Sequence, residues 1–341
     1  MKRVTALIIV LVLTVSLFGA CSKVKNESGA SDSKIKVVTT IFPIYDWVRN
    51  IDKDNNCDIS FLMNSGADLH SYQPTADDMV KIYDCDMFIY VGGESDKWVD
   101  DALGNASNKD MVVINLLDVL SDRIKEEEIK EGMQSEEESE SEDEEEEIEY
   151  DEHIWLSLRN AQICVTEIAG KLSAIKNIEN GDFISAAEEY NKSLESLDNE
   201  YNSLIKEVKN EKKPVVLVFG DRFPFRYMVE DYSIDYYAAF VGCSAESEAS
   251  FETVKFLANK VDELGLKYVI VLEGGDGKLA QTIINNTESK SAKTITLNSM
   301  QNITQQNVDN GSSYIDIMYS NLGGLSLALR DIPYGGNSST E

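Results

Sequence analysis

Short apolar runs alternate along this chain with stretches whose apolar residues recur at helical spacing. In the first half the apolar runs are KVVTT from Lys36, DISFLM (58–63), MFIYVGG (87–93) and VVIN (112–115). Strands buried on both faces have this continuous apolar character, because helices cover both sides of a parallel sheet. The first half is therefore predicted to be an α/β lobe built from βαβ units.

The second half repeats the same alternation of strand and helix. Its apolar runs are PVVLVF (214–219), YYAAF (236–240), YVIVLE (268–273) and KTITLN (293–298). Two similar α/β lobes, each a parallel sheet flanked by helices, are therefore the expected fold.

One long amphipathic segment separates the two halves. In FISAAEEYNKSLESLDNEYNSLIKEVKNEKK, apolar residues recur three or four positions apart, at Ala187, Tyr190, Leu194, Leu197, Tyr201, Leu204 and Val208. This spacing predicts a single helix. About 25 helical residues are roughly 37 Å long, which is enough to run along both lobes as one rigid linking helix. Packing on one lobe alone is the alternative.

The first 21 residues have the pattern of an export signal. MKRVTALIIVLVLTVSLFGAC contains two basic residues, an apolar run and small residues immediately before Cys21. The end of this stretch resembles a bacterial lipobox, although Phe18 stands where leucine is usual. We therefore expect Cys21 to be lipid-modified and to become the new N-terminus, with a simply cleaved signal as the alternative. The polar residues 22–33 are then a tether.

The charge is strongly negative and unevenly distributed. The formal net charge is -30, and about half of it lies between Glu126 and Glu152. Nucleic acid is excluded as a partner, because phosphate binding requires clustered Lys and Arg. Cations are the natural ligands of such a chain. The acidic run itself, about residues 125–150, is predicted to be a disordered loop that either only adds solubility or attracts cations.

Four cysteines remain after Cys21: Cys57, Cys85, Cys164 and Cys243. Their spacing fits no zinc-finger pattern, so thiolate ligation of a metal is not expected. Two interpretations stay open. Either an extracytoplasmic disulfide joins Cys57 to Cys85, or all four are small buried side chains.

The chain has only two histidines, and both lie at the edge of a predicted element. His70 follows the strand DISFLM in GADLHSYQPTADDM, and His153 follows the acidic run in DEHIWLSL. Ligands of open α/β sheets bind at the carboxyl ends of the strands, which is where His70 falls. This placement favours a shared binding site over two incidental histidines.

These motifs resemble the zinc and manganese substrate-binding lipoproteins of bacterial ABC importers, called cluster A-I. The resemblance runs from about Lys36 to Arg330 and rests on DLHSYQPTADD, DEHIWLSL, Tyr190-Asn191, SAESEAS and SYIDIMYSNL. It implies two lobes joined by one helix, with a metal held in the cleft between them. It also implies that His70 and His153 are the two metal ligands of the first lobe, and that the acidic run replaces a histidine-rich loop.

The second lobe departs from the pattern of the family. Gly220 followed by Asp221 stands where relatives have His or Glu, and Asn298 stands where many have Asp. A dication bound by two neutral imidazoles needs at least one nearby carboxylate. We therefore expect Asp221 or Glu273 as a ligand, with Asn298 offering a carbonyl oxygen and water completing the shell. Asp221 as a helix N-cap and Glu273 as a solvated carboxylate are the alternatives.

The sequence thus predicts an extracytoplasmic, lipid-anchored and monomeric binding protein that captures Zn(II) and delivers it to an ABC permease with its cytoplasmic ATPase. Alternatives are Mn(II) as the ion, or a metal-dependent adhesin. A metallohydrolase is disfavoured because no HExxH motif occurs. GGESD (92–96) and EGGDG (273–277) lack the spacing of phosphate loops and are expected to be turns.

The predicted division of the chain follows from these elements. Residues 34–182 form the first lobe and residues 213–332 the second. Residues 183–212 form the linking helix, and residues 333–341 form a tail.

Overall fold

The computed structural model describes residues 34–134, 149–175, 182–242 and 248–332. The predicted export signal, Cys21, the tether, most of the acidic run, Cys243 and the tail lie outside these residues. Within them, no helix combines the length and the apolar character needed to cross a membrane.

The first lobe is built on a four-stranded parallel sheet, as predicted. Its strands pair in the order β2-β1-β3-β4. They are β1 (Ile35–Thr39), β2 (Cys57–Phe61), β3 (Met87–Tyr90) and β4 (Val112–Asn115). Thr39 at the end of β1 pairs with Phe61 on one side and with Ile89 on the other. The carboxyl ends of these strands therefore share one edge, and the loops that follow them meet there.

The second lobe repeats this design. Its four parallel strands pair in the order β6-β5-β7-β8. They are β5 (Val216–Phe223), β6 (Asp235–Val241), β7 (Tyr268–Leu272) and β8 (Lys293–Leu297). All eight predicted strands are thus present, and the predicted fold class is confirmed.

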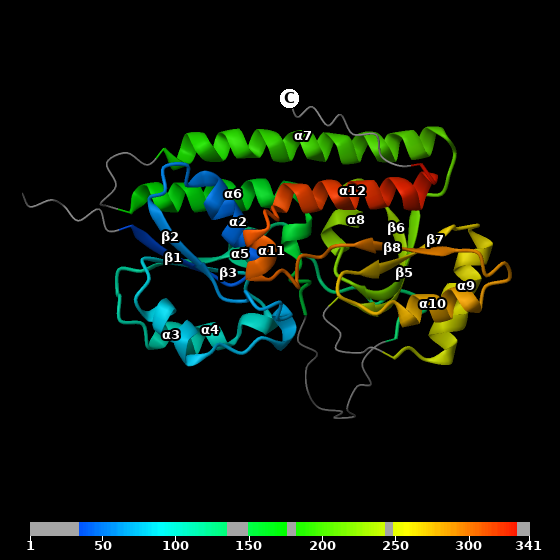
Figure 1. Cartoon of the computed structure of the whole chain (residues 1–341), viewed down its shortest axis with the longest axis horizontal. Helices are drawn as coiled ribbons and strands as arrows, with labels where there is room; N and C mark the ends of the chain where they lie inside the picture. Colours follow the sequence, from blue (N-terminus) through cyan, green and yellow to red (C-terminus); the bar gives the residue numbers. More distant parts are fainter. Residues whose placement is uncertain (1–33, 135–148, 176–181, 243–247, 333–341) are drawn as a thin grey trace, which may run out of the picture. The chain divides into compact units, whose positions relative to one another are not determined.

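Helices cover both faces of each sheet. In Figure 1, α3 and α4 lie on one side of the first sheet, while α2 and α6 lie on the other. The first-lobe helices are α2 (Phe42–Ile51), α3 (Ala76–Tyr83), α4 (Trp98–Gly104), α5 (Leu116–Val119) and α6 (Leu158–Ala174). The second-lobe helices are α8 (Arg226–Tyr232), α9 (Phe251–Glu263) and α10 (Lys278–Asn285). The short helix α11 (Gln305–Asp309) follows β8 but lies beside the first lobe in Figure 1, where the backbone N–H of Gln305 donates to the carbonyl of Asn64 at 2.8 Å. The capping box of Thr75 and Asp78 begins α3.

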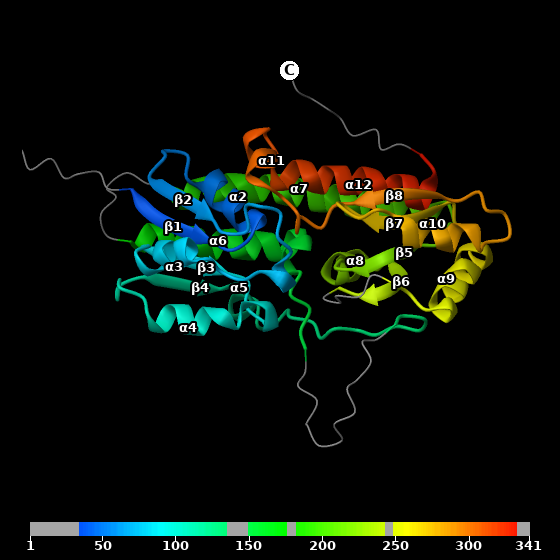
Figure 2. The same cartoon turned by 60° about the horizontal axis from the view of Figure 1, so that its bottom comes forward.

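The long helix α7 (Phe183–Asn210) packs against both lobes. It contacts α2 and α6 of the first lobe and α8 of the second, and it lies beside α12 (Tyr314–Arg330) in both Figure 1 and Figure 2. Its predicted apolar stripe, from Ala187 to Val208, is buried throughout. A helix of 28 residues is about 42 Å long, so packing on one lobe alone does not hold.

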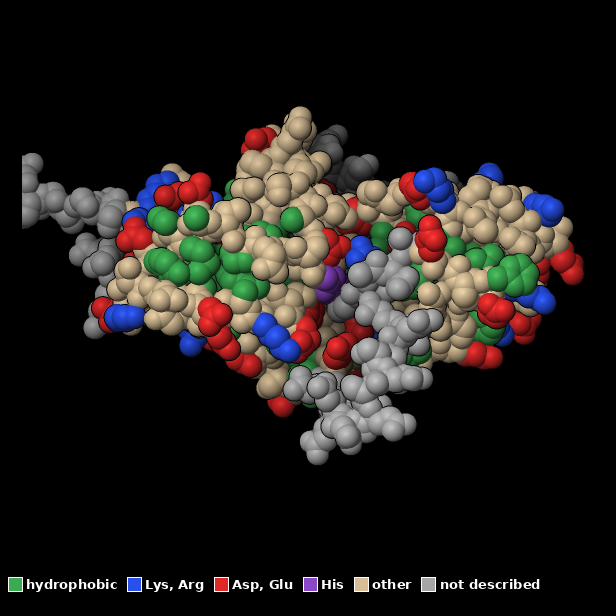
Figure 3. Space-filling model, turned by 90° about the horizontal axis from the view of Figure 1, so that it is seen from below, with side chains coloured by type: hydrophobic (Ala, Val, Ile, Leu, Met, Phe, Trp, Pro, Cys, Tyr) green, Lys and Arg blue, Asp and Glu red, His purple; other side chains and the backbone are tan. Residues whose placement is uncertain are grey.

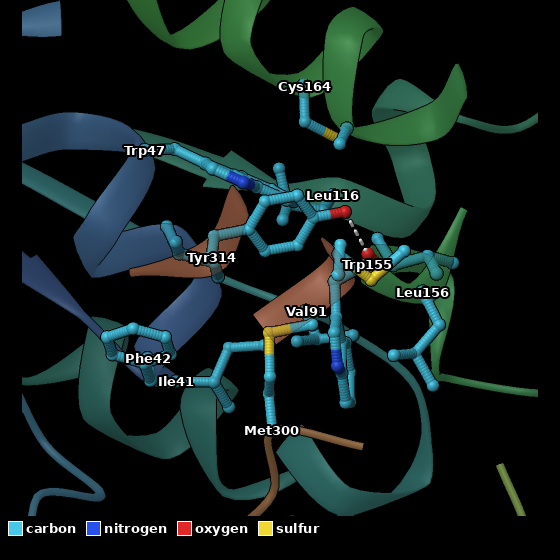
Figure 4. Packing of buried hydrophobic residues seen from close by; sticks show 14 of the residues in the cluster. Ile41, Phe42, Trp47, Val91, Leu116, Trp155, Leu156, Cys164, Met300 and Tyr314 are labelled. Atoms are coloured by element: carbon cyan, nitrogen blue, oxygen red, sulfur yellow. Dashed lines mark hydrogen bonds between the residues drawn. The ribbon is translucent and has the colours of Figure 1, made fainter. Parts of the chain in front are cut away.

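The start of α12 is inserted into the first lobe, which the sequence did not predict. The backbone N–H of Tyr314 donates to Asp46 of α2 at 2.9 Å, and its hydroxyl donates to the carbonyl of Trp155 at 2.6 Å. Figure 4 shows this tyrosine among Trp47, Trp155 and Met300. Since α12 also packs on β8, β7 and β5, it joins the two cores.

The core is continuous through α7 and α12, with a second cluster between the second sheet and its helices α9 and α10. Cys57, Cys85 and Cys164 are buried in the first lobe as thiols. The disulfide between Cys57 and Cys85 is therefore absent, and the interpretation of small buried side chains holds for these three cysteines.

Candidate metal site

The two histidines meet, although 83 residues separate them in the sequence. His70 lies in a short 3₁₀ turn (Leu69–Ser71) that follows β2, and His153 immediately precedes a second 3₁₀ turn (Ile154–Leu156). Their Nε2 atoms are 3.2 Å apart. His153 is fully buried, so the histidine surface visible between the acidic side chains in Figure 3 is that of His70, whose side chain is 14% exposed.

The opposite nitrogen of each ring faces an oxygen. The Nδ1 atom of His153 lies 3.0 Å from Oδ1 of Asp151. The Nδ1 atom of His70 lies 2.8 Å from Oγ of Ser95 and 3.6 Å from Oε2 of Glu152. Because a carboxylate only accepts hydrogen bonds, these acids favour a proton on Nδ1 and a lone pair on Nε2.

Burial and charge set the protonation of this pair. Burial and repulsion from His153 lower the pKa of His70 to about 3. Burial acts to lower the pKa of His153, but the carboxylates of Asp151, Glu152 and Glu127 together raise that pKa above its ordinary value. Burial raises the pKa of Glu152, against hydrogen bonds from Ser95. At neutral pH the imidazole pair therefore carries at most one positive charge, and that charge belongs to His153.

The second lobe contributes Gln301, which the sequence analysis missed. Its Nε2 atom lies 3.0 Å from Nε2 of His153, and its Oε1 accepts a hydrogen bond from Ser299 at 3.0 Å. Ser299 is itself fixed, because its carbonyl accepts from the indole of Trp155 at 2.8 Å. The only signal in the sequence was the position of Gln301 just beyond the predicted strand that ends at Asn298.

The three second-lobe side chains that the sequence favoured as metal ligands already accept hydrogen bonds from backbone N–H groups. Asp221 accepts from the N–H groups of Arg222 (2.9 Å) and Leu272 (3.1 Å). Glu273 accepts from the N–H groups of Ser299 (2.7 Å) and Gln301 (3.2 Å). The side-chain oxygen of Asn298 likewise accepts from the N–H of Met300 at 2.7 Å.

Consequently, the structure brings the two histidines together without these carboxylates. Across the described residues, no group of three or more His, Cys, Asp or Glu side chains is close enough to hold an ion.

A positive charge from the second lobe also reaches the site. Arg222 in β5 donates through Nη2 to Oδ2 of Asp68 at 2.9 Å. The other oxygen of Asp68 accepts from the backbone N–H of His70. The guanidinium is near enough to contribute to the lowered pKa of His70. Arg222 therefore links the lobes beside the imidazole pair and opposes additional positive charge there.

The spacing of the two imidazoles can be compared with zinc coordination. Nitrogens bound about 2.05 Å from a tetrahedral ion stand about 3.3 Å from one another. The observed separation of the Nε2 atoms is 3.2 Å. The pair is thus spaced as two ligands of a single ion.

Comparison with known proteins supports a metal-binding assignment. The family model described as "Zinc-uptake complex component A periplasmic" matches residues 37–328. A Bacillus subtilis protein named high-affinity zinc uptake system protein ZnuA is 31% identical over 317 residues, which cover 92% of this chain and 94% of that protein. The zinc-binding protein AdcA of Streptococcus pyogenes is 25% identical over 324 residues, 94% of this chain and 61% of AdcA. The chain thus spans about three fifths of the length of this relative.

Solved structures share the fold. The metal-dependent lipoprotein YcdH of Bacillus subtilis superimposes with a TM-score of 0.68 at 25% identity, covering 86% of this chain and 99% of that one. The Zn(II)-bound ZnuA-like domain of Streptococcus pneumoniae AdcA gives a TM-score of 0.65 at 25% identity, covering 87% and 99%.

Proposed function

Because this chain belongs to the family of periplasmic zinc-uptake components A, we propose that it captures Zn(II) outside the cytoplasm and delivers it to a membrane ABC permease. The family is one of solute-binding transport proteins and not of enzymes. The observation that carries the proposal is the 3.2 Å separation of two Nε2 atoms whose rings are each held from the opposite side.

His70 and His153 are the proposed ligands from the first lobe. From the second lobe, rotation of the Gln301 amide would turn its oxygen toward the ion and its NH₂ toward Ser299, which can accept. Water completes a tetrahedral shell. Asp221, Glu273 and Asn298 are secondary candidates, because each must first give up backbone hydrogen bonds.

The donor set favours zinc over manganese. Imidazole suits zinc, whereas manganese prefers carboxylate, carbonyl and water oxygens. All three proposed protein donors are neutral, so the ion's charge is balanced from behind, by Asp151 and Glu152 on the far nitrogens of the histidines. Outer carboxylates of this kind orient a ligating imidazole and make it more basic.

Delivery requires that the ion leave a buried site. His153 has no exposed surface, so a ligand must withdraw before zinc can depart. Gln301 is the natural ligand to withdraw, because it comes from the opposite lobe. We further propose that the mature chain is a monomer held at the membrane by a lipid on Cys21, and that the acidic run raises the local cation concentration.

Zinc titration of the chain without residues 1–21 tests this proposal. A binding protein gains stability as RT ln(1 + [L]/Kd), so zinc at a hundredfold excess over Kd should add about 2.7 kcal/mol. Isothermal titration should give one tight site for zinc and a weaker one for manganese. No rise in the unfolding midpoint with either ion would overturn the proposal.

A further inference from the structure

Glu152 lies behind His70 in a closely fitted position. Its side chain is 2% exposed, and its Oε1 accepts from the backbone N–H of Ser95 at 2.9 Å. Its Oε2 is buried without a hydrogen-bond partner among the described residues, at 3.6 Å from Nδ1 of His70. A buried carboxylate oxygen that accepts no hydrogen bond lowers the stability of the folded state. Its position facing the His70 ring therefore points to a functional role.

The GGESD turn makes room for this carboxylate. Gly93 has a φ of +84°, and a Cβ atom there would lie 2.3 Å from Oε1 and 2.8 Å from Cδ of Glu152. Only glycine fits both this backbone conformation and this contact. Two residues later, Ser95 binds Glu152 through its backbone and His70 through its hydroxyl. The turn thus holds the acid and the imidazole in fixed relation.

Ser95 alone does not decide which nitrogen of His70 carries the proton. A hydroxyl can donate or accept, so it is compatible with either tautomer. A carboxylate accepts only, and Glu152 therefore favours the tautomer with Nδ1–H. In the other tautomer the proton lies on Nε2, where it blocks the lone pair that faces His153.

We propose that Glu152 is a positioning residue that keeps the His70 proton on Nδ1 and leaves Nε2 free to bind a metal ion. The part concerning metal binding rests on the proposed function, whereas the part concerning the tautomer does not. Glu152 touches neither Nε2 atom in the described geometry, so it acts through His70.

Glutamine at this position makes a sharp test. The N–H of Ser95 requires an acceptor at the Oε1 position, so Glu152→Gln must place its NH₂ where Oε2 now faces His70. That group donates to Nδ1 and forces the proton onto Nε2. A structural role predicts that the near-isosteric Gln is milder than Ala. The positioning role predicts instead that Gln impairs metal binding at least as much as Ala, although Gln is the more stable variant.

Nitrogen-15 NMR of the histidine rings reads the tautomer directly, because the chain has only two histidines. We would record metal-free wild type, Glu152→Gln, Glu152→Ala and the control Glu149→Gln, whose residue is exposed. Wild type and control should show His70 protonated at Nδ1, and Glu152→Gln should show it protonated at Nε2. The same tautomer in Glu152→Gln and wild type overturns the proposal, with thermal unfolding reporting the fold of each variant.

Zinc titration of the same four proteins completes the test. Loss of such an outer partner typically weakens metal binding by about 10–100-fold. We expect that loss for Glu152→Gln and none for Glu149→Gln. If wild type binds zinc and Glu152→Gln binds it equally well, the positioning role fails while the proposed function stands. If wild type binds no zinc but the tautomer changes, the proposed function fails and the assignment of Glu152 to the ring proton stands.

Discussion

The two lobes face the candidate site with opposite chemistry. The first lobe presents two imidazoles, each with a carboxylate near its far nitrogen. The second lobe presents an amide, Gln301, and a guanidinium, Arg222, while its own acids Asp221 and Glu273 accept from backbone N–H groups. The first lobe is therefore built to attract a cation, and the second lobe is neutral or repulsive toward one.

This difference gives the two lobes separate roles: the first lobe provides the affinity for the ion, and the second lobe closes over it. Ligands that hold an ion tightly must be oriented before it arrives, and only the first lobe presents ligands whose far nitrogens face carboxylates. The second lobe supplies contacts that can form and break without leaving a charged ligand uncoordinated. Four changes, in order of decreasing expected effect, test this division of roles and the contact through which α12 joins the lobes.

Removing either imidazole should remove most of the affinity. Zinc bound by four protein ligands gains about 10–16 kcal/mol, so each ligand is worth on the order of 3 kcal/mol, or more than a hundredfold. His153→Ala and His70→Ala should each lose at least that factor in isothermal titration, with circular dichroism unchanged. Affinity within threefold of wild type for either variant would show that the ring is not a ligand.

Asp46 tests the contact where α12 enters the first lobe. Burial raises the pKa of Asp46 to about 6, from 3.8. The folded state thus binds the proton of the Asp46 carboxyl more tightly than the unfolded state does. The stabilisation from this difference is fully present below about pH 4 and is lost as pH rises to 6.

The loss amounts to about 2–3 kcal/mol at 1.36 per pKa unit. Asp46→Asn should remove this dependence, so its free energy of unfolding should rise relative to wild type between pH 4 and pH 7. Urea denaturation at pH 4 and pH 7 measures the free energy of unfolding of each protein. The same change with pH in Asp46→Asn and wild type would contradict this assignment to Asp46.

Giving the second lobe a carboxylate should strengthen the site. Gln301→Glu places an anionic oxygen where an amide now approaches His153, and we expect zinc to bind about tenfold more tightly. Gln301→Leu, the matched uncharged control, should bind zinc more weakly than wild type. Release should slow in Gln301→Glu, as measured by transfer of zinc to a chelator. Equal affinities in all three proteins would exclude Gln301 from the site.

The ion pair of Arg222 and Asp68 should give the smallest effect. Their side chains are 23% and 19% exposed, so we expect Arg222→Met to lose only about 1 kcal/mol of stability. Zinc affinity should rise by a few-fold, because a positive charge near His70 is removed. A double-mutant cycle with Asp68→Asn isolates the pair. A fall in zinc affinity would mean that the link between the lobes made by Arg222 and Asp68 matters more for binding than the repulsion between Arg222 and the ion.

Local patterns in the sequence determined most of the fold. Most of the eight strands were recognisable because they are largely buried and hence continuously apolar, whereas the edge strands β2, β4 and β8 leave several residues exposed or half-buried. The length of α7 followed from the stripe at Leu194, Leu197 and Tyr201. The insertion of α12 did not follow, because Tyr314 in SYIDIMYSNL looks like any apolar helix residue until α2 and Trp155 stand opposite it. The exact division of the chain between lobes stays a prediction.

The site was predictable only in part. The meeting of His70 and His153 followed from strand ends and from the family resemblance, whereas their role as ligands stays a prediction. Gln301 was missed because it reaches the site through a turn in which Met300 has a φ of +64°, a conformation that residue type does not indicate. Asp221 was favoured for its charge, but hydrogen bonds from Arg222 and Leu272 occupy it, and these depend on the neighbouring strand.

The path of α12 has a consequence for how the protein unfolds. A single hinge between two lobes commonly lets each half melt on its own, which gives two calorimetric transitions. Here Tyr314 is anchored by α2 and Trp155, while the rest of its helix packs on the second sheet. Melting either half therefore exposes apolar surface in the other, so the chain should denature cooperatively in one transition.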